Sequence, residues 1–155
     1  MISYKHTQIG YLMIFITLAV LGLFTWVHLS ALAEPPSFNS GPNFAISSVM
    51  VLILFILASF MTLIISIDEK YLGIKFGYGL FQKKLLLNEI VSVRVVKNRW
   101  YYGWGIKLRL WPTTWIYNVS GFQAVELIMK NGKIYRIGID EPNKLESAIL
   151  AVMNK

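Results

Sequence analysis

The densest group of side chains able to bind a ligand lies in residues 98–105, with the sequence NRWYYGWG. Trp and Tyr favour the headgroup depth of a membrane, and each nearby Lys or Arg is attracted to anionic lipid by about 1 kcal/mol. We therefore expect a membrane-docking or ligand-binding loop made of Arg99, Trp100, Tyr101, Tyr102 and Trp104. The alternative is that Tyr102 and Trp104 are core residues at a corner of a sheet.

Five other cations define a second candidate, a basic face made of Lys75, Lys83, Lys84, Arg94 and Lys97. Such a face would attract anionic groups, because each of these residues carries a positive charge. The alternative is that these residues lie on solvated strand faces close to a negatively charged membrane leaflet.

Catalytic chemistry has little support in the sequence. The chain has no cysteine, and its two histidines, His6 and His28, precede the segment expected to fold as a domain. We find no pairing of a nucleophile with a base, no cluster of metal ligands and no phosphate-binding loop. The sequence therefore predicts a protein that is not an enzyme and that has no cofactor, metal site or nucleic-acid partner.

Two long apolar runs, residues 9–33 and 44–67, contain no Asp, Glu, Lys or Arg. About 20 residues at roughly 1.5 Å each cross the hydrocarbon core of a bilayer, so both runs are predicted membrane spans. Fourteen of the 15 Lys and Arg residues follow Glu69, and residues 68–155, which also hold seven Asp and Glu residues, carry the whole net charge of +7. We therefore expect a transmembrane hairpin over residues 1–67 and a basic domain over residues 68–155.

The distribution of positive charge predicts the orientation of the hairpin. The connector, residues 34–43, has three prolines and no Lys or Arg, whereas several lysines follow the second run. The positive-inside rule then places both termini in the cytoplasm of a multi-pass protein of the cell (inner) membrane. The sequence Ala31-Leu32-Ala33 also has the small-x-small form of a signal-peptidase site, so cleavage of the first run is the alternative.

The remaining residues alternate between polar and apolar types in seven short runs, which indicates strands. The runs are residues 71–76, 83–87, 90–96, 106–110, 115–119, 124–129 and 133–138. Asn131-Gly132 between the last two is a strong hairpin signal. After Asp140 and Pro142, the apolar stripe of Leu145, Ile149 and Val152 predicts a final helix that covers the end of a sandwich or barrel.

This arrangement resembles the pleckstrin-homology-like (PH-like) domains of bacterial membrane-anchored proteins, in which a helical hairpin precedes such a domain. The motifs that carry the resemblance are IKFG at 74–77, IVSVRVV at 90–96, YYGWGI at 101–106, VSG at 119–121, AVEL at 124–127 and IG at 137–138 followed by DEP at 140–142. The resemblance implies a fold and a membrane location but no particular chemistry.

From these observations we expect a non-catalytic, membrane-anchored binding or scaffolding module at the inner leaflet. A protein partner or self-association is the first expectation for its ligand. The alternative is direct binding of anionic lipid or a small ligand, and an enzyme of lipid or envelope metabolism is a third hypothesis.

Overall fold

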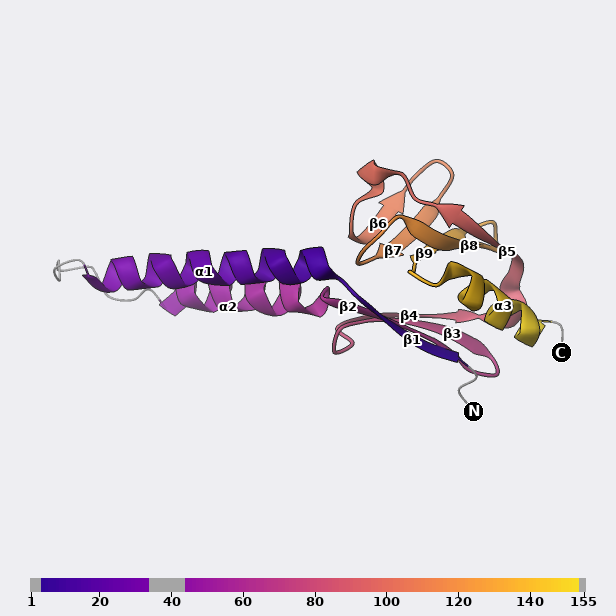
Figure 1. The fold of residues 1–155 in the computed structure, drawn as a ribbon, viewed down its shortest axis with the longest axis horizontal. Coiled ribbons are helices and arrows are strands. Elements are labelled where there is room, and N and C mark those ends of the chain that lie inside the picture. The colour runs from indigo at the N-terminus through magenta and orange to yellow at the C-terminus, as the bar shows by residue number, and fades with distance from the viewer. Residues whose placement is uncertain (1–3, 34–43, 154–155) are drawn as a thin grey trace.

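The computed structural model describes residues 4–33 and 44–153 and has a helical part and a mainly β part (Figure 1). The helical part consists of α1 (Tyr11–Ala33) and α2 (Phe44–Ser59). The β part contains β1 (Tyr4–Ile9), β2 (Thr62–Ile67), β3 (Tyr71–Phe76), β4 (Phe81–Leu86), β5 (Ile90–Lys97), β6 (Gly105–Arg109), β7 (Thr114–Asn118), β8 (Gln123–Met129) and β9 (Ile134–Gly138). Two short 3₁₀ turns, η1 (Leu87–Glu89) and η2 (Trp100–Tyr102), and a final helix, α3 (Pro142–Met153), complete it.

The strands form two sheets. One sheet has the order β1-β2-β3-β4, with each pair antiparallel. The other has the order β5-β8-β9-β7-β6, in which β7 and β9 are parallel and the other pairs are antiparallel. The β8–β9 hairpin turns at Asn131-Gly132, where Gly132 has a positive φ and the Lys133 N–H donates to Asn131 Oδ1. The predicted hairpin is therefore confirmed.

All seven predicted strands are present, with bounds that differ by a few residues, and two further strands precede them. The second apolar run was expected to be helical through residue 67, and this expectation is wrong because α2 ends at Ser59 and residues 62–67 form β2. Leu63, Ile65 and Ile67 are fully buried, while the residues between them are half-buried. A short apolar run of this kind cannot be distinguished from a helix by hydropathy alone.

The N-terminal residues also belong to the β part. Strand β1 pairs along its whole length with β2, from Tyr4 opposite Ile67 to Ile9 opposite Thr62. A domain boundary between residues 67 and 68 would divide this sheet between β2 and β3. The two helices are therefore inserted between adjacent, paired strands of one sheet.

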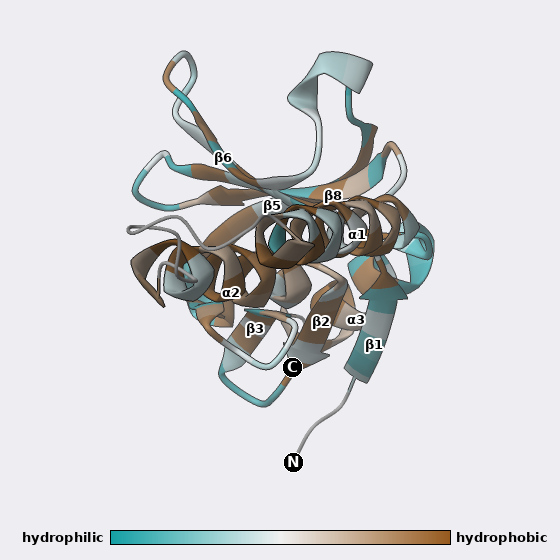
Figure 2. Cartoon of the chain, turned by 90° about the vertical axis from the view of Figure 1, so that its left-hand side faces the viewer, coloured by the Kyte–Doolittle hydropathy of each residue, from teal (hydrophilic) through white to brown (hydrophobic). Residues whose placement is uncertain are grey.

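Helices α1 and α2 lie side by side and extend from one end of the β part (Figure 1). Among the described residues, only α1 is both long and apolar enough to cross a membrane. At about 1.5 Å per residue it measures about 34 Å, and the 16-residue α2 about 24 Å. Exposed apolar side chains cover both helices, which are mostly brown in Figure 2.

The helices join the sheet without a flexible linker. Only Gly10 separates β1 from α1, and its N–H donates to the Met61 carbonyl at 2.7 Å. The β3–β4 turn packs against the end of α2, where the rings of Tyr78 and Phe55 lie 4.8 Å apart and the Gly77 N–H donates to the Thr62 carbonyl at 2.9 Å. These contacts fix the direction in which the helices leave the β part.

Replacement of Gly77 should disturb this junction. Gly77 has a φ of +46°, and an added Cβ would lie 2.7 Å from the Ser59 carbonyl oxygen. Gly77→Ala should therefore lower the free energy of unfolding by about 2–4 kcal/mol, from backbone strain and overpacking together. Gly132→Ala is the matched control, because Gly132 also has a positive φ but an added Cβ would meet open space. Thermal unfolding of the two variants in detergent tests this, and equal losses would contradict a special role for Gly77.

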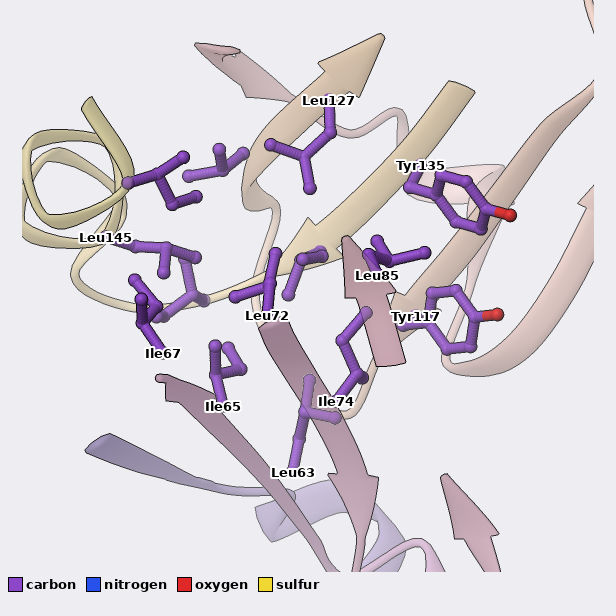
Figure 3. Close-up of a cluster of buried hydrophobic side chains, with 14 of the residues drawn as sticks. Leu63, Ile65, Ile67, Leu72, Ile74, Leu85, Tyr117, Leu127, Tyr135 and Leu145 are labelled. Carbon is purple, nitrogen blue, oxygen red and sulfur yellow. The ribbon is translucent and has the colours of Figure 1, made fainter. Parts of the chain in front are cut away.

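The hydrophobic core lies between the two sheets and against α3. Figure 3 shows side chains from both sheets and from α3 pointing toward one another, among them Leu63, Leu72, Leu127 and Leu145. Leu145 and Ile149 are fully buried and Val152 packs against the core, as the apolar stripe predicted. Before α3, the Asp140 carboxylate accepts a hydrogen bond from His6 Nε2 at 2.6 Å, which joins the start of α3 to β1.

Candidate functional site

The aromatic segment forms a loop that includes η2 and connects β5 to β6. Tyr102 is buried under this loop on the outer face of the five-stranded sheet, where Arg109 Nη1 donates to its hydroxyl at 2.9 Å. The Arg136 guanidinium lies 5.5 Å from the centre of the Tyr102 ring, a cation–π contact. Tyr102 therefore holds the loop against the sheet.

The other predicted loop residues lie at the surface. Trp100 is 79% exposed, Tyr101 about half exposed and Trp104 more than one-third exposed. Arg99 is also exposed, and its Nη1 donates to the Tyr101 hydroxyl at 2.8 Å. The structure thus brings the predicted residues together, but with Tyr102 facing the sheet and the others facing solvent.

Hydrogen bonds connect this loop to the place where α1 begins. Gln8, two residues before Gly10, donates through Nε2 to the Ser120 carbonyl and hydroxyl oxygens, both at 2.8 Å. Next to Ser120, the Gly121 carbonyl accepts a hydrogen bond from Asn118 Nδ2 at 3.1 Å. The Phe122 carbonyl accepts one from the Asn98 N–H, at the start of the loop, at 2.6 Å. The loop therefore lies on the side of the β part from which the helices extend, as does the β6 edge in Figure 1.

Two hollows flank the ring of Tyr101. The first, of about 490 Å³, is lined by Lys97, Asn98, Arg99, Trp100, Tyr101 and Phe122. The second, of about 320 Å³, is lined by Tyr101, Tyr102, Lys107, Leu108, Arg109 and Ile116. Each hollow is lined by two cations and aromatic rings, and no carboxylate lines either. Both therefore favour an anionic ligand over a cationic one.

Four lining residues were not among the predicted site residues: Asn98, which lies at the start of the predicted segment 98–105, and Lys107, Arg109 and Phe122. Lys107 and Arg109 alternate with apolar residues along β6, so both were predicted to face away from the core. Their position beside the aromatic loop depends on how the chain turns back at residues 103–105. Asn98 and Phe122 carry no such signal, because only the fold places them together.

The predicted basic face is divided between the two sheets. Lys75, Lys83 and Lys84 lie on β3 and β4 of the four-stranded sheet, whereas Arg94 and Lys97 lie on β5 of the other. Lys83 and Lys84 are also neighbours on one strand, so they point to opposite faces of it. Of these five residues, only Lys97 lies beside the aromatic loop.

Arg94 instead belongs to a buried ion network. Glu126 on β8 is 2% exposed and lies in register between Arg94 on β5 and Arg136 on β9. Arg94 Nε donates to Oε1 at 2.7 Å, and Arg136 Nε donates to Oε2 at 2.6 Å. Burial alone would raise the pKa of Glu126, but the hydrogen bonds and charges of the two arginines outweigh it and lower the pKa.

Comparison of the chain with protein-family models and with curated proteins gave no match. Within residues 4–33 and 44–153, no group of three or more His, Cys, Asp or Glu side chains could hold a metal ion. A function must therefore be inferred from the aromatic and cationic loop and from its position beside α1.

Proposed function

We propose that this protein is a non-catalytic, membrane-anchored binding module whose β part is held at the cytoplasmic face of a membrane. In this proposal α1 and α2 cross the bilayer as a hairpin and both termini are cytoplasmic. The apolar side chains on the surfaces of both helices support the crossing. The lysines that follow β2 support the orientation, because positive residues favour the cytoplasmic side.

The position of β1 favours an uncleaved hairpin. Cleavage after Ala33 would leave β1 on the released peptide, although β1 pairs with β2 along its full length. The connector, residues 34–43, lies outside the described residues. We therefore propose that the first apolar run remains in the mature protein.

The relationship to PH-like domains is also part of this proposal. It is supported by two packed sheets, by a meander of antiparallel strands in the first sheet and by a C-terminal helix that packs on the core. The helices inserted between β1 and β2, and the parallel β7–β9 pair, are features that the seven-stranded plan did not include.

The surface that would contact the membrane consists of exposed residues on the aromatic loop and on β6, on the side of the β part from which the helices extend. We define this docking surface as Arg99, Trp100, Tyr101, Trp104, Lys107 and Arg109. Exposed Trp and Tyr rings suit the headgroup layer, and each cation adds about 1 kcal/mol of attraction to an anionic leaflet. The observation that carries the proposal is the set of hydrogen bonds from Gln8 to Ser120 and from Asn98 to Phe122, which place the base of the aromatic loop near the start of α1.

Removal of two positive charges from the docking surface should weaken its contact with anionic lipid. The experiment uses the full chain in nanodiscs of phosphatidylcholine, with or without an equal part of phosphatidylglycerol. Hydrogen exchange of residues 98–109 should slow in the anionic discs and return to the neutral-disc rate at high salt. The double variant Arg99→Gln, Lys107→Gln should lose most of this protection.

The matched control is Lys130→Gln, Lys133→Gln, which removes the same charge from the hairpin at the opposite end of β8 and β9. This control should keep the protection. Equal protection in neutral and anionic discs, or equal loss in the two double variants, would contradict docking by this surface.

A protein partner is a second candidate, supported by the tip of the β6–β7 hairpin. Trp111 is 86% exposed there, beside the exposed Leu110, and large aromatic side chains are common anchors of protein interfaces. A photocrosslinker at position 111 should then give one product of defined mass, lost when Leu110 is changed to Ser. A product that persists in Leu110→Ser would count against this candidate.

A further inference from the structure

A groove opens between the edges of the two sheets. Strand β4 is an edge of the first sheet and β6 an edge of the second, and residues of both line the groove together with residues of β3 and β7. Its volume is about 250 Å³. We call it the edge groove, and its apolar lining consists of Ile74, Phe76, Phe81, Ile106, Trp115 and Tyr117. Figure 3 shows two of these side chains, Ile74 and Tyr117, which come from the two facing sheets. Because Phe81, Ile106 and Trp115 are only partly buried, the edge groove is an apolar extension of the core that is open at one side.

The edge groove lies beside the end of α2. The ring of Phe81 stacks on that of Phe60, the residue that follows α2, with ring centres 5.1 Å apart. The half-exposed Leu80 also lines the groove, and it belongs to the β3–β4 turn that packs against α2 (Figure 1). With α1 and α2 across a bilayer, the groove would therefore open close to the lipid surface.

One cation shares the core-facing side of β4. Lys83 lies opposite Ile74 on β3, and residues directly opposite each other share one face of a sheet. Phe81 and Leu85, two positions away on either side, share that face and are apolar. Lys83 is exposed, it lines the edge groove, and within residues 4–33 and 44–153 its ammonium group makes no ion pair. It is also the only charged residue among the described residues that line the groove.

We infer that the edge groove binds a free fatty acid. The carboxylate pairs with Lys83 at the mouth of the groove, and the acyl chain lies along the apolar lining. A single cation with no carboxylate beside it suits one anionic headgroup, and the apolar lining suits a hydrocarbon chain. The inference rests on the proposed function in one respect, since the fatty acid reaches the groove from the membrane.

The size of the edge groove separates a fatty acid from a phospholipid. An apolar cavity of about 150 Å³ holds one benzene molecule, so 250 Å³ suits part of one acyl chain rather than two chains. The chain supplies most of the affinity. Each methylene group removed from water raises the binding constant about fourfold, whereas an exposed ion pair raises it about fivefold at most.

Photolabelling of the full chain in phosphatidylcholine nanodiscs tests the inference. The probe is decanoic acid with a diazirine near its methyl end, and mass spectrometry maps the labelled residues. Label on α1 and α2 measures the probe dissolved in the bilayer, so it should rise in proportion to the amount added. Label on residues 74–83 and 106–117 should instead saturate. Unlabelled decanoate should compete for it, and decyltrimethylammonium, which has the same chain and a positive charge, should not.

Three variants locate the ligand within the groove. Lys83→Glu should weaken the saturable label about fivefold to tenfold, because attraction of the carboxylate becomes repulsion. Lys84→Glu is the matched control, because Lys84 points to the opposite face of β4, and it should keep the label. Ile106→Phe fills part of the groove and should weaken the label about tenfold or more, as for the loss of two buried methylene groups. Both lysines are exposed, so this pair of variants decides the question if Ile106→Phe does not fold.

Each remaining outcome overturns a defined part of the inference. Label on the helices without saturable label in the groove would overturn the site and leave the proposed function intact. Lys83 would then serve only as an inward-facing charge that protects an edge strand from pairing with another chain. Saturable label in the groove with none on α1 and α2 would contradict the membrane crossing but not the site. Equal loss in Lys83→Glu and Lys84→Glu, or equal competition by decyltrimethylammonium, would overturn the pairing of a carboxylate with Lys83.

Discussion

Residues 69–155 alone are expected not to fold, although they contain all seven strands that the sequence predicts. This fragment lacks β1 and β2 and with them the buried side chains of Leu63, Ile65 and Ile67. Burial of three such side chains contributes about 5–9 kcal/mol. The loss is comparable to the whole stability of a typical domain, about 5–15 kcal/mol, so the fragment should show no cooperative unfolding transition.

A second variant, which keeps β1 and β2 but lacks α1 and α2, is expected to fold. Residues 11–59 are removed, and Gly10 is joined to Phe60 through a short Asn-Gly turn that closes β1 and β2 into a hairpin. Because Ile9 and Thr62 are already paired, this chain should fold as a soluble domain with a cooperative thermal transition. Native-like spectra from residues 69–155, or failure of the joined chain to fold, would contradict the placement of β1 and β2 in the sheet.

Glu126→Gln is expected to cause the largest loss of stability from a single side chain outside the apolar core. Gln has nearly the same shape, but it removes the negative charge that lies between Arg94 and Arg136. Loss of one member of a buried ion pair costs about 3–5 kcal/mol, and we expect about 2–4 because Arg94 is mostly exposed. Chemical denaturation of the full chain in detergent measures this loss.

Arg94→Gln is the matched control for Glu126→Gln. It leaves the carboxylate paired with Arg136, so the loss should be about 1 kcal/mol. Glu126→Gln should also loosen the aromatic loop, because Arg136 contacts the ring of Tyr102. Faster hydrogen exchange at residues 98–105 in Glu126→Gln, but not in Arg94→Gln, would support this link. Equal losses of stability in both variants would contradict the central role of Glu126.

The same network predicts the pH dependence of stability. The pKa of Glu126 is lowered from an ordinary value of 4.5, so its contribution is fully present above pH 4.5 and is lost as the pH falls through the lowered pKa. The difference in stability between the native chain and Glu126→Gln should therefore be constant near neutral pH and shrink below pH 4.5. A difference that grows as the pH falls would contradict the sign of the shift.

Local patterns predicted most of the β part and the final helix. The alternation of polar and apolar residues predicted strands β3 to β9. The Asn131-Gly132 turn predicted the last hairpin, and the apolar stripe of Leu145 and Ile149 predicted α3. Strands β1 and β2 were missed because their pairing is long-range, across an insertion of two helices, and because the apolar run of β2 continues that of α2. Periodicity carries no information about a partner more than 50 residues away.

The candidate site was predicted in composition but not in geometry. Residue types identified the aromatic loop, but they could not show that Tyr102 faces Arg109 and Arg136 while Trp100 faces solvent. Arg94 and Arg136 lie 32 and 10 residues from Glu126 in the chain. Only the register of the three strands in the sheet shows that both arginines pair with this carboxylate.

The direct junction between sheet and helices has a consequence for how this protein would meet other molecules. A domain on a flexible tether explores a hemisphere above the membrane, and its reach grows with the length of the tether. Here Gly10 alone separates β1 from α1, so a hairpin that crosses the bilayer would hold each surface group at a constant height above the lipid. Encounters with other membrane components would then depend on lateral diffusion and on rotation about the membrane normal, a search in two dimensions.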